Sequence, residues 1–160
     1  MRIEAKPHAR TVLWTLNNDS LTRITSSYNK IAETVAGKLT GGTDSTQLGR
    51  PSFVFVDEQK NIFVCDQWNH RIQKWAPGAK AAVTVAGGRG AGNRLSQLNN
   101  PAGIFVAADG LIYVADTDND RVVVWKEGDT TGSVVAGGNG GGLKANQLSY
   151  PTSVFVKHIS

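Results

Sequence analysis

Short stretches in which apolar and polar residues alternate recur along the chain, separated by turns rich in Gly, Asp and Asn. One series of such stretches runs from Phe53 to Trp75, and a similar series runs from Ile104 to Trp125. Alternation with a period of two predicts β-strands with one buried face, and apolar segments this short are poor candidates for helices. The chain is therefore predicted to be all-β.

Each series, extended by one further apolar segment, predicts a four-stranded antiparallel sheet in which consecutive strands pair. In the first sheet the expected strands are Phe53–Asp57, Ile62–Cys65, Arg71–Trp75 and Ala82–Ala86. In the second sheet they are Ile104–Ala108, Ile112–Ala115, Arg121–Trp125 and Ser133–Ala136. Asp109-Gly110 supplies the positive φ that a tight hairpin turn requires.

The two sheets are copies of one repeat, because matching residues lie fifty positions apart. Pro51, Pro101 and Pro151 open three successive copies, and the last of these begins PTSVFVK. The copies also share a Gln-Leu pair shortly before each proline, at residues 47–48, 97–98 and 147–148. A repeat of this length is typical of a β-propeller, in which each copy forms one four-stranded blade.

The second and third strands of each copy carry the motif Val-x-Asp-x-x-Asn-x-Arg. Its residues are Val64, Asp66, Asn69 and Arg71, and again Val114, Asp116, Asn119 and Arg121. This motif resembles the NHL repeat, and the resemblance extends over residues from about 33 to 156. The resemblance implies a propeller of NHL-type blades, commonly six.

The repeat divides residues 1–160, taken as one propeller segment, into about three blades. Blade 2 is expected at about 51–87 and blade 3 at about 101–137, and residues 151–157 supply the first strand of a further blade. Blade 1, at about 11–37, lacks a clear first strand. Its expected strands are Val12–Leu16, Leu21–Ser26 and Glu33–Ala36.

Three blades are too few to close a ring, and an open arc would expose apolar blade faces. Two interpretations follow. The chain is a fragment of a longer six-bladed protein, or two chains pair head to tail in a homodimer. In the dimer, each chain lends its last strand to the first blade of the other.

The polar and aromatic residues that recur at the same place in both copies are interpreted as structural. An Asp is expected to cap the turn between the second and third strands, and an Arg to pair with a neighbour or a carbonyl. These repeat residues are Asp66, Asn69, Arg71, Trp75, Asp116, Asn119, Arg121 and Trp125.

The residues that differ between copies are the candidates for ligand binding. In the usual propeller layout, the turns between the second and third strands share one face with the connections between blades, and recognition concentrates in such loops. The candidates are Lys38, Gln67, Trp68, His70, Arg89, Asn93, Arg94, Asp118, Asp120 and Lys144. An exposed Trp68 with basic neighbours is suited to anchoring a peptide or stacking an RNA base.

The sequence gives little support for catalysis, a cofactor or a metal. The loops at Gly87–Gly92 and Gly137–Gly142 lack the helix that follows a dinucleotide fingerprint and the Lys-Ser/Thr ending of a P-loop. The run Asp116–Asp120 resembles the start of a calcium loop, but Arg121 stands where that loop needs glycine. His8, His70 and His158 do not supply a convergent set of metal ligands.

Composition adds few constraints. The net charge of +4 arises from basic residues spread along the chain, which permits nucleic-acid binding without demanding it. The single cysteine, Cys65, excludes an intrachain disulfide and is expected to be buried. Residues 1–10 lack the apolar core of a signal peptide and no segment predicts a membrane span, so the default expectation is the cytoplasm.

The sequence therefore predicts a non-catalytic interaction module that presents a loop-rich rim to a protein or peptide. Two alternatives remain open. One is RNA binding, which the resemblance to tripartite-motif NHL proteins allows. The other is a lyase or hydrolase with a metal in the propeller channel, as in NHL-like peptidyl-amidoglycolate lyases.

Overall fold

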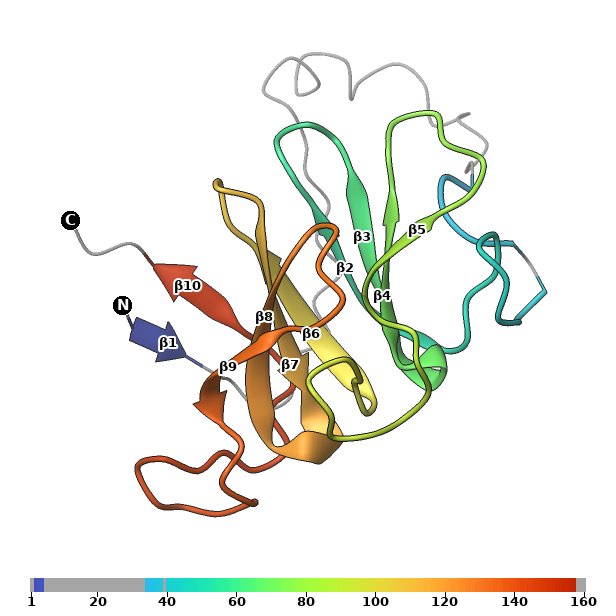
Figure 1. Ribbon diagram of the computed structural model, residues 1–160. Helices are drawn as coiled ribbons and strands as arrows, with labels where there is room; N and C mark the ends of the chain where they lie inside the picture. Colours follow the sequence, from blue (N-terminus) through green and yellow to red (C-terminus); the bar gives the residue numbers. More distant parts are fainter. Residues whose placement is uncertain (1, 5–33, 39, 158–160) are drawn as a thin grey trace, which may run out of the picture.

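The computed structural model describes residues 2–4, 34–38 and 40–157 and contains two four-stranded antiparallel sheets (Figure 1). The first sheet consists of β2 (Pro51–Val56), β3 (Ile62–Asp66), β4 (Arg71–Trp75) and β5 (Val83–Gly87). The second consists of β6 (Pro101–Val106), β7 (Leu111–Asp116), β8 (Arg121–Lys126) and β9 (Ser133–Gly137). The strand order in each sheet follows the sequence, as in a propeller blade, so the prediction of blade 2 and blade 3 as four-stranded sheets is confirmed.

Short 3-10 turns, Gln67–Asn69 and Thr117–Asn119, join the second and third strands of the two blades. Each turn ends on a left-handed residue, His70 or Asp120, which reverses the chain into the next strand. Among the described residues, no helix is long and apolar enough to cross a membrane.

The main hydrophobic core lies between the two blades, which are neighbours in Figure 1. Blade 2 contributes Phe63, Cys65 and Ile72 to this core, and blade 3 contributes Ile112 and Trp125 among others. Alternation explains this arrangement, because every second residue of a strand faces the same neighbouring blade. The two sheets are thus packed together as consecutive blades of an open, partial propeller.

The opposite face of blade 3 is covered by the segment that follows it. Val154 packs with Tyr113 and Val122 in a second core cluster. Gly103 permits this close approach, since a Cβ at that position would lie 2.5 Å from the carbonyl oxygen of Thr152. Residues 151–157, which were expected to form the first strand of a further blade, are in strand conformation at β10 (Phe155–Lys157).

A further strand, β1 (Arg2–Glu4), pairs antiparallel with β10, so these two segments from opposite ends of the sequence lie side by side (Figure 1). The strands predicted at Val12–Leu16 and Leu21–Ser26 lie outside the described residues, as do His8 and His158. Of the strand predicted at Glu33–Ala36, the described residues 34–36 are not in strand conformation.

A row of phenylalanines links the first strands of successive copies. The ring centroids of Phe55 and Phe105 are 5.8 Å apart, and those of Phe105 and Phe155 are 5.2 Å apart, both edge to face. This geometry is favourable for aromatic pairs. The same contact is therefore repeated from blade 2 to blade 3 and from blade 3 to β10.

Candidate binding rim

A buried carboxylate holds the turn of blade 3 in place. The side chain of Asp116 is fully buried, and its oxygens accept hydrogen bonds from Arg121 Nε at 2.7 Å and Asn119 Nδ2 at 2.8 Å. A third bond comes from the backbone N–H of Asn99, at 2.6 Å, in the loop that precedes the blade. Because buried polar groups need partners, this carboxylate fixes the turn relative to the loop.

The same turn also donates hydrogen bonds to loop 88–100, which connects blade 2 to blade 3. The guanidinium of Arg121 contacts the carbonyl oxygens of Asn93, Arg94 and Gln97 at 2.8 to 3.2 Å. Asn119 Nδ2 contacts the carbonyl oxygen of Gly92 at 2.8 Å. The planar guanidinium thus binds three carbonyl groups of one loop at the same time.

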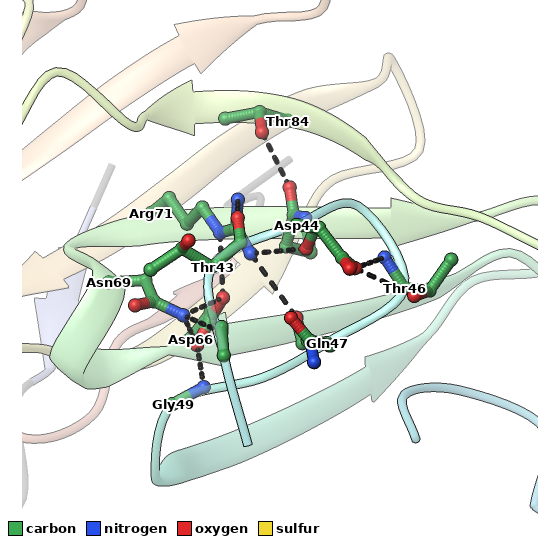
Figure 2. A network of polar contacts seen from close by, with 11 residues as sticks. Thr43, Asp44, Thr46, Gln47, Gly49, Asp66, Asn69, Arg71 and Thr84 are labelled. Atoms are coloured by element: carbon green, nitrogen blue, oxygen red, sulfur yellow. Dashed lines mark hydrogen bonds and ion pairs between the residues drawn. The ribbon is translucent and has the colours of Figure 1, made fainter. Parts of the chain in front are cut away.

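Blade 2 repeats this network, which Figure 2 shows in detail. Asp66 accepts hydrogen bonds from Arg71 Nε at 2.6 Å, from Asn69 Nδ2 and from the backbone N–H of Gly49. Arg71 donates to the carbonyl oxygens of Thr43, Asp44 and Gln47 in residues 40–50. The motif residues therefore make structural contacts, and Arg71 bonds carbonyl groups as expected. The expected capping of the turn by Asp is wrong, because neither Asp66 nor Asp116 makes a side-chain cap hydrogen bond to the 3-10 turn that follows it. Each carboxylate instead accepts from the Asn and Arg side chains of the motif and from a backbone N–H of the preceding loop.

Burial raises the pKa of the Asp116 carboxyl, although its hydrogen bonds from Asn119, Asn99 and Arg121 lower it. The net upward direction means that desolvation of the carboxylate outweighs the stabilisation of its charge. A buried ion pair of this kind fixes geometry more than it adds net stability. Removal of either partner is nevertheless expected to lower the free energy of unfolding, because the other partner would remain buried and unpaired.

The residues before Pro51 and Pro101 pair with the third residue of the 66–70 and 116–120 turns respectively, and we call these two contacts the rim pairs. In blade 2, the guanidinium of Arg50 lies over the ring of Trp68, 5.3 Å from its centroid. In blade 3, Asn100 Nδ2 donates a hydrogen bond to Asp118. Tyr150 occupies the same place in the next copy.

The rim pairs begin at left-handed residues, since φ is 48° at Arg50, 51° at Asn100 and 46° at Tyr150. Two of these residues are held by the last residue of the preceding turn. The backbone N–H of Asn100 donates to His70 Nδ1 at 3.1 Å, and that of Tyr150 donates to Asp120 Oδ1 at 2.8 Å. His70 and Asp120 thus serve the same structural purpose in their blades.

This equivalence makes a specific prediction for His70. Replacement of His70 by alanine is expected to lower the free energy of unfolding by about 1 kcal/mol, because the amide of Asn100 loses its acceptor. Replacement by aspartate, the residue that blade 3 uses, is expected to stay within about 0.5 kcal/mol of the parent chain. Urea unfolding curves check both values, and equal losses in the two variants would contradict the equivalence.

Apart from Lys38, the structure places the predicted rim residues in the 66–70 and 116–120 turns and in the loops bonded to them. Trp68 has 61% of its surface exposed, whereas Gln67, His70 and Asp120 are half-buried. The remaining candidates, Lys38, Arg89, Asn93, Arg94, Asp118 and Lys144, are exposed. Sequence reasoning missed Arg50, Asn100 and Tyr150, although their position before each repeated proline was a usable signal.

A hollow of about 440 Å³ lies between the two blades, and sequence reasoning missed it as well. Its lining combines Phe55, Phe63 and Phe105 with an ion pair, at 2.7 Å, between Lys74 of blade 2 and Glu127, which follows β8 in blade 3. Its other walls come from residues 56–61 and 106–112, around the first hairpin of each blade. Sequence reasoning missed it because its lining residues come from segments about fifty residues apart and carry no common motif.

Potential catalytic groups are sparse in the described part of the chain. No group of three or more His, Cys, Asp or Glu side chains there is arranged to hold a metal ion. Cys65 is buried in the core between the blades, and burial raises the pKa of its thiol. A thiol that is protonated and covered in this way is a poor nucleophile.

Comparison with known proteins agrees with this geometry. The family model for the NHL repeat matches residues 98–125, from the end of loop 88–100 through most of β8. The matched region includes Asp116, Asn119 and Arg121, whose network blade 2 reproduces. Among curated proteins, no sequence matches the chain. The chain therefore contains an NHL repeat at residues 98–125, and its two described four-stranded sheets are arranged as blades of a partial β-propeller.

Proposed function

We propose that the chain is a non-catalytic interaction module that binds a protein or peptide through the rim formed by its 66–70 and 116–120 turns and adjoining loops. The observation that carries this proposal is an exposed aromatic side chain on an anchored backbone. The Trp68 residue has 61% of its surface exposed, while its backbone N–H donates a hydrogen bond to the carbonyl oxygen of Gly49 at 3.0 Å. Such rigidity reduces the entropy lost when a ligand binds.

The chemistry at Trp68 suits a peptide with an apolar side chain next to a carboxylate. The indole offers a flat apolar surface, and the guanidinium of Arg50 lies over that ring. Tryptophan and arginine are among the residues that contribute most to protein interfaces. His70 lies half-buried in the same turn. Its Nδ1 accepts a hydrogen bond from the backbone N–H of Asn100, and its other ring nitrogen, Nε2, is a further polar group of this turn.

Selection from a peptide library displayed on phage tests the proposal. Peptides that bind the full chain are expected to lose at least about tenfold in affinity against Trp68→Ala, as for a moderate interface hot spot. The matched control is Val83→Ala, since Val83 is 62% exposed but lies on β5, away from the rim. Equal affinity for Trp68→Ala and the parent chain would contradict the proposed site.

RNA is the second candidate, because the stack of Arg50 on Trp68 also resembles a platform for a nucleotide base. The acidic residues Asp118 and Asp120 on the next turn count against an extended phosphate contact. Binding of single-stranded oligouridine, measured over a range of salt, separates the two functions. An affinity that falls steeply with salt, with no peptide selected, would favour RNA over the peptide.

A further inference from the structure

The hollow of about 440 Å³ between the two blades lies at the opposite end of the sheets from the binding rim. Its walls include residues of the first hairpin of each blade, within 56–61 and 106–112, whereas the rim is built on the 66–70 and 116–120 turns. Because consecutive strands of each sheet are antiparallel, the hairpins and the turns fall at opposite ends of the strands (Figure 1). A ligand in the hollow would therefore bind a surface other than the rim.

Aromatic rings form the apolar wall of the hollow. Phe55 contacts Phe63 and Phe105 edge to face, with ring centroids 6.5 and 5.8 Å apart. Phe55 and Phe105 are half-buried, so their rings keep apolar surface that a ligand can cover. The volume falls within the range of about 300 to 1,000 Å³ that is usual for small-molecule sites. The hollow is therefore large enough for a small molecule with an apolar group.

Carboxylates predominate among the charged groups that line the hollow. These groups are Asp57, Glu58 and Glu127, against the single ammonium of Lys74. Three carboxylates against one ammonium leave a formal charge of −2, although the whole chain carries +4. Lys74 is paired with Glu127 at 2.7 Å, and among the described residues no cation pairs with Asp57 or Glu58. The lining thus has negative charge that its own cation does not neutralise.

The charged residues of the hollow are not required by the repeat. In the other copy, alanines stand at the positions equivalent to Asp57 and Glu58, a valine at that of Lys74 and a proline at that of Glu127. Both blades nevertheless form the same four-stranded sheet. Asp57 accepts two hydrogen bonds from Asn61 within its hairpin, whereas Glu58 is exposed and makes no hydrogen bond in the described part of the chain. Glu58 in particular is therefore available to a ligand.

The wall of the hollow already holds one ammonium group. Lys74 Nζ lies 5.7 Å from the centroid of the Phe63 ring and 2.7 Å from Glu127 Oε2. An aromatic face and a carboxylate both attract a cation, and the attraction is stronger where water is partly excluded. Lys74 thus shows the kind of contact that the hollow can offer to the cationic group of a ligand.

We propose that this hollow binds a small organic cation, a protonated amine carried on an apolar group. The apolar group would lie against Phe55 and Phe105, and the ammonium would lie beside Glu58 and Asp57. Charge complementarity carries the proposal, because a carboxylate ligand would meet uncompensated negative charge and a neutral ligand would leave it unused.

Three ligands that share one apolar stem test the proposal on the full chain. They are 4-phenylbutylamine, 4-phenylbutanol and 4-phenylbutyrate, titrated at pH 7 and low ionic strength and followed by two-dimensional NMR. The amine is expected to bind saturably, at least about tenfold more tightly than the alcohol or the acid, and to shift the amide signals of residues 56–61 and 106–112. Equal affinities for the three ligands, or shifts confined to the 66–70 and 116–120 turns, would overturn the proposal.

Removal of one carboxylate provides the first matched pair of variants. Glu58→Gln keeps the shape of the side chain but removes its charge, and is expected to weaken binding of 4-phenylbutylamine by at least about fivefold. The control is Asp118→Asn, which makes the same change of charge at the rim end of blade 3 and is expected to stay within about twofold of the parent chain. Equal affinities in the two variants would exclude Glu58 from the site.

Removal of the lining cation is expected to act in the opposite direction. Lys74→Met eliminates a charge that repels the ligand and frees Glu127, so 4-phenylbutylamine is expected to bind at least about fivefold more tightly. Valine at the equivalent position of the other copy indicates that an apolar residue fits this strand, and circular dichroism checks that the sheets persist. A damaged fold cannot raise affinity, so unchanged or weaker binding by a folded Lys74→Met chain would contradict the proposed role of charge.

Discussion

Replacement of Asp116 by alanine is expected to lower the free energy of unfolding by about 3 to 5 kcal/mol. The change leaves the guanidinium of Arg121, which is 6% exposed, without its carboxylate. It also removes the acceptor for Asn119 Nδ2 and for the N–H of Asn99. The expected loss is large because buried donors must give up water without gaining a partner.

Urea unfolding followed by tryptophan fluorescence measures this loss for Asp116→Ala. The matched control is Asp118→Ala, because Asp118 lies two residues away in the same turn but is exposed. That control is expected to change the free energy by about 1 kcal/mol or less. Similar curves for the two variants would show that the buried network does not hold the turn in place.

Replacement of Trp125 by alanine is also expected to lower the free energy of unfolding by about 3 to 5 kcal/mol, through a different mechanism. Trp125 is 1% exposed and belongs to the core that blade 2 and blade 3 share. Removal of its indole creates a cavity between the sheets that neighbouring side chains cannot fill without moving the blades. The interface between blades, rather than one sheet alone, is weakened.

The control for Trp125→Ala is Trp68→Ala, since Trp68 is the most exposed tryptophan of the described chain. We expect the control to change the free energy of unfolding by about 0.5 kcal/mol or less. Differential scanning calorimetry measures both variants without relying on tryptophan fluorescence. A small loss at Trp125 would mean that the two blades fold without depending on their common core.

The sequence predicted the strands well because apolar alternation and turn residues act locally. The strand Arg71–Trp75 has the predicted bounds, and most other strands differ by one or two residues. The first strand of each blade begins earlier than expected, at Pro51 and Pro101. Proline is a weak strand former, but it is tolerated at the first position, here next to a bulge where the pairing register shifts.

Contacts between distant segments were less accessible to sequence reasoning. The Asp66 and Asp116 networks follow a repeated motif, but the carbonyl groups that Arg71 and Arg121 contact have no side-chain signature. The pairing of β1 with β10 was not expected, because Arg2–Glu4 has no counterpart in the repeat. The binding role of the rim stays a prediction, since a sequence shows which loops vary but not what they contact.

The residue before each of the three prolines has a left-handed backbone, and this bears on which substitutions the rim tolerates. Glycine would adopt that conformation without strain, yet the chain has Arg50, Asn100 and Tyr150 there. Three side chains of different charge, size and polarity thus share one backbone shape. Mutation at these positions can therefore change the side chains that the rim presents while its backbone shape is kept, so the ligand specificity we propose for the rim is separable from the stability of the fold.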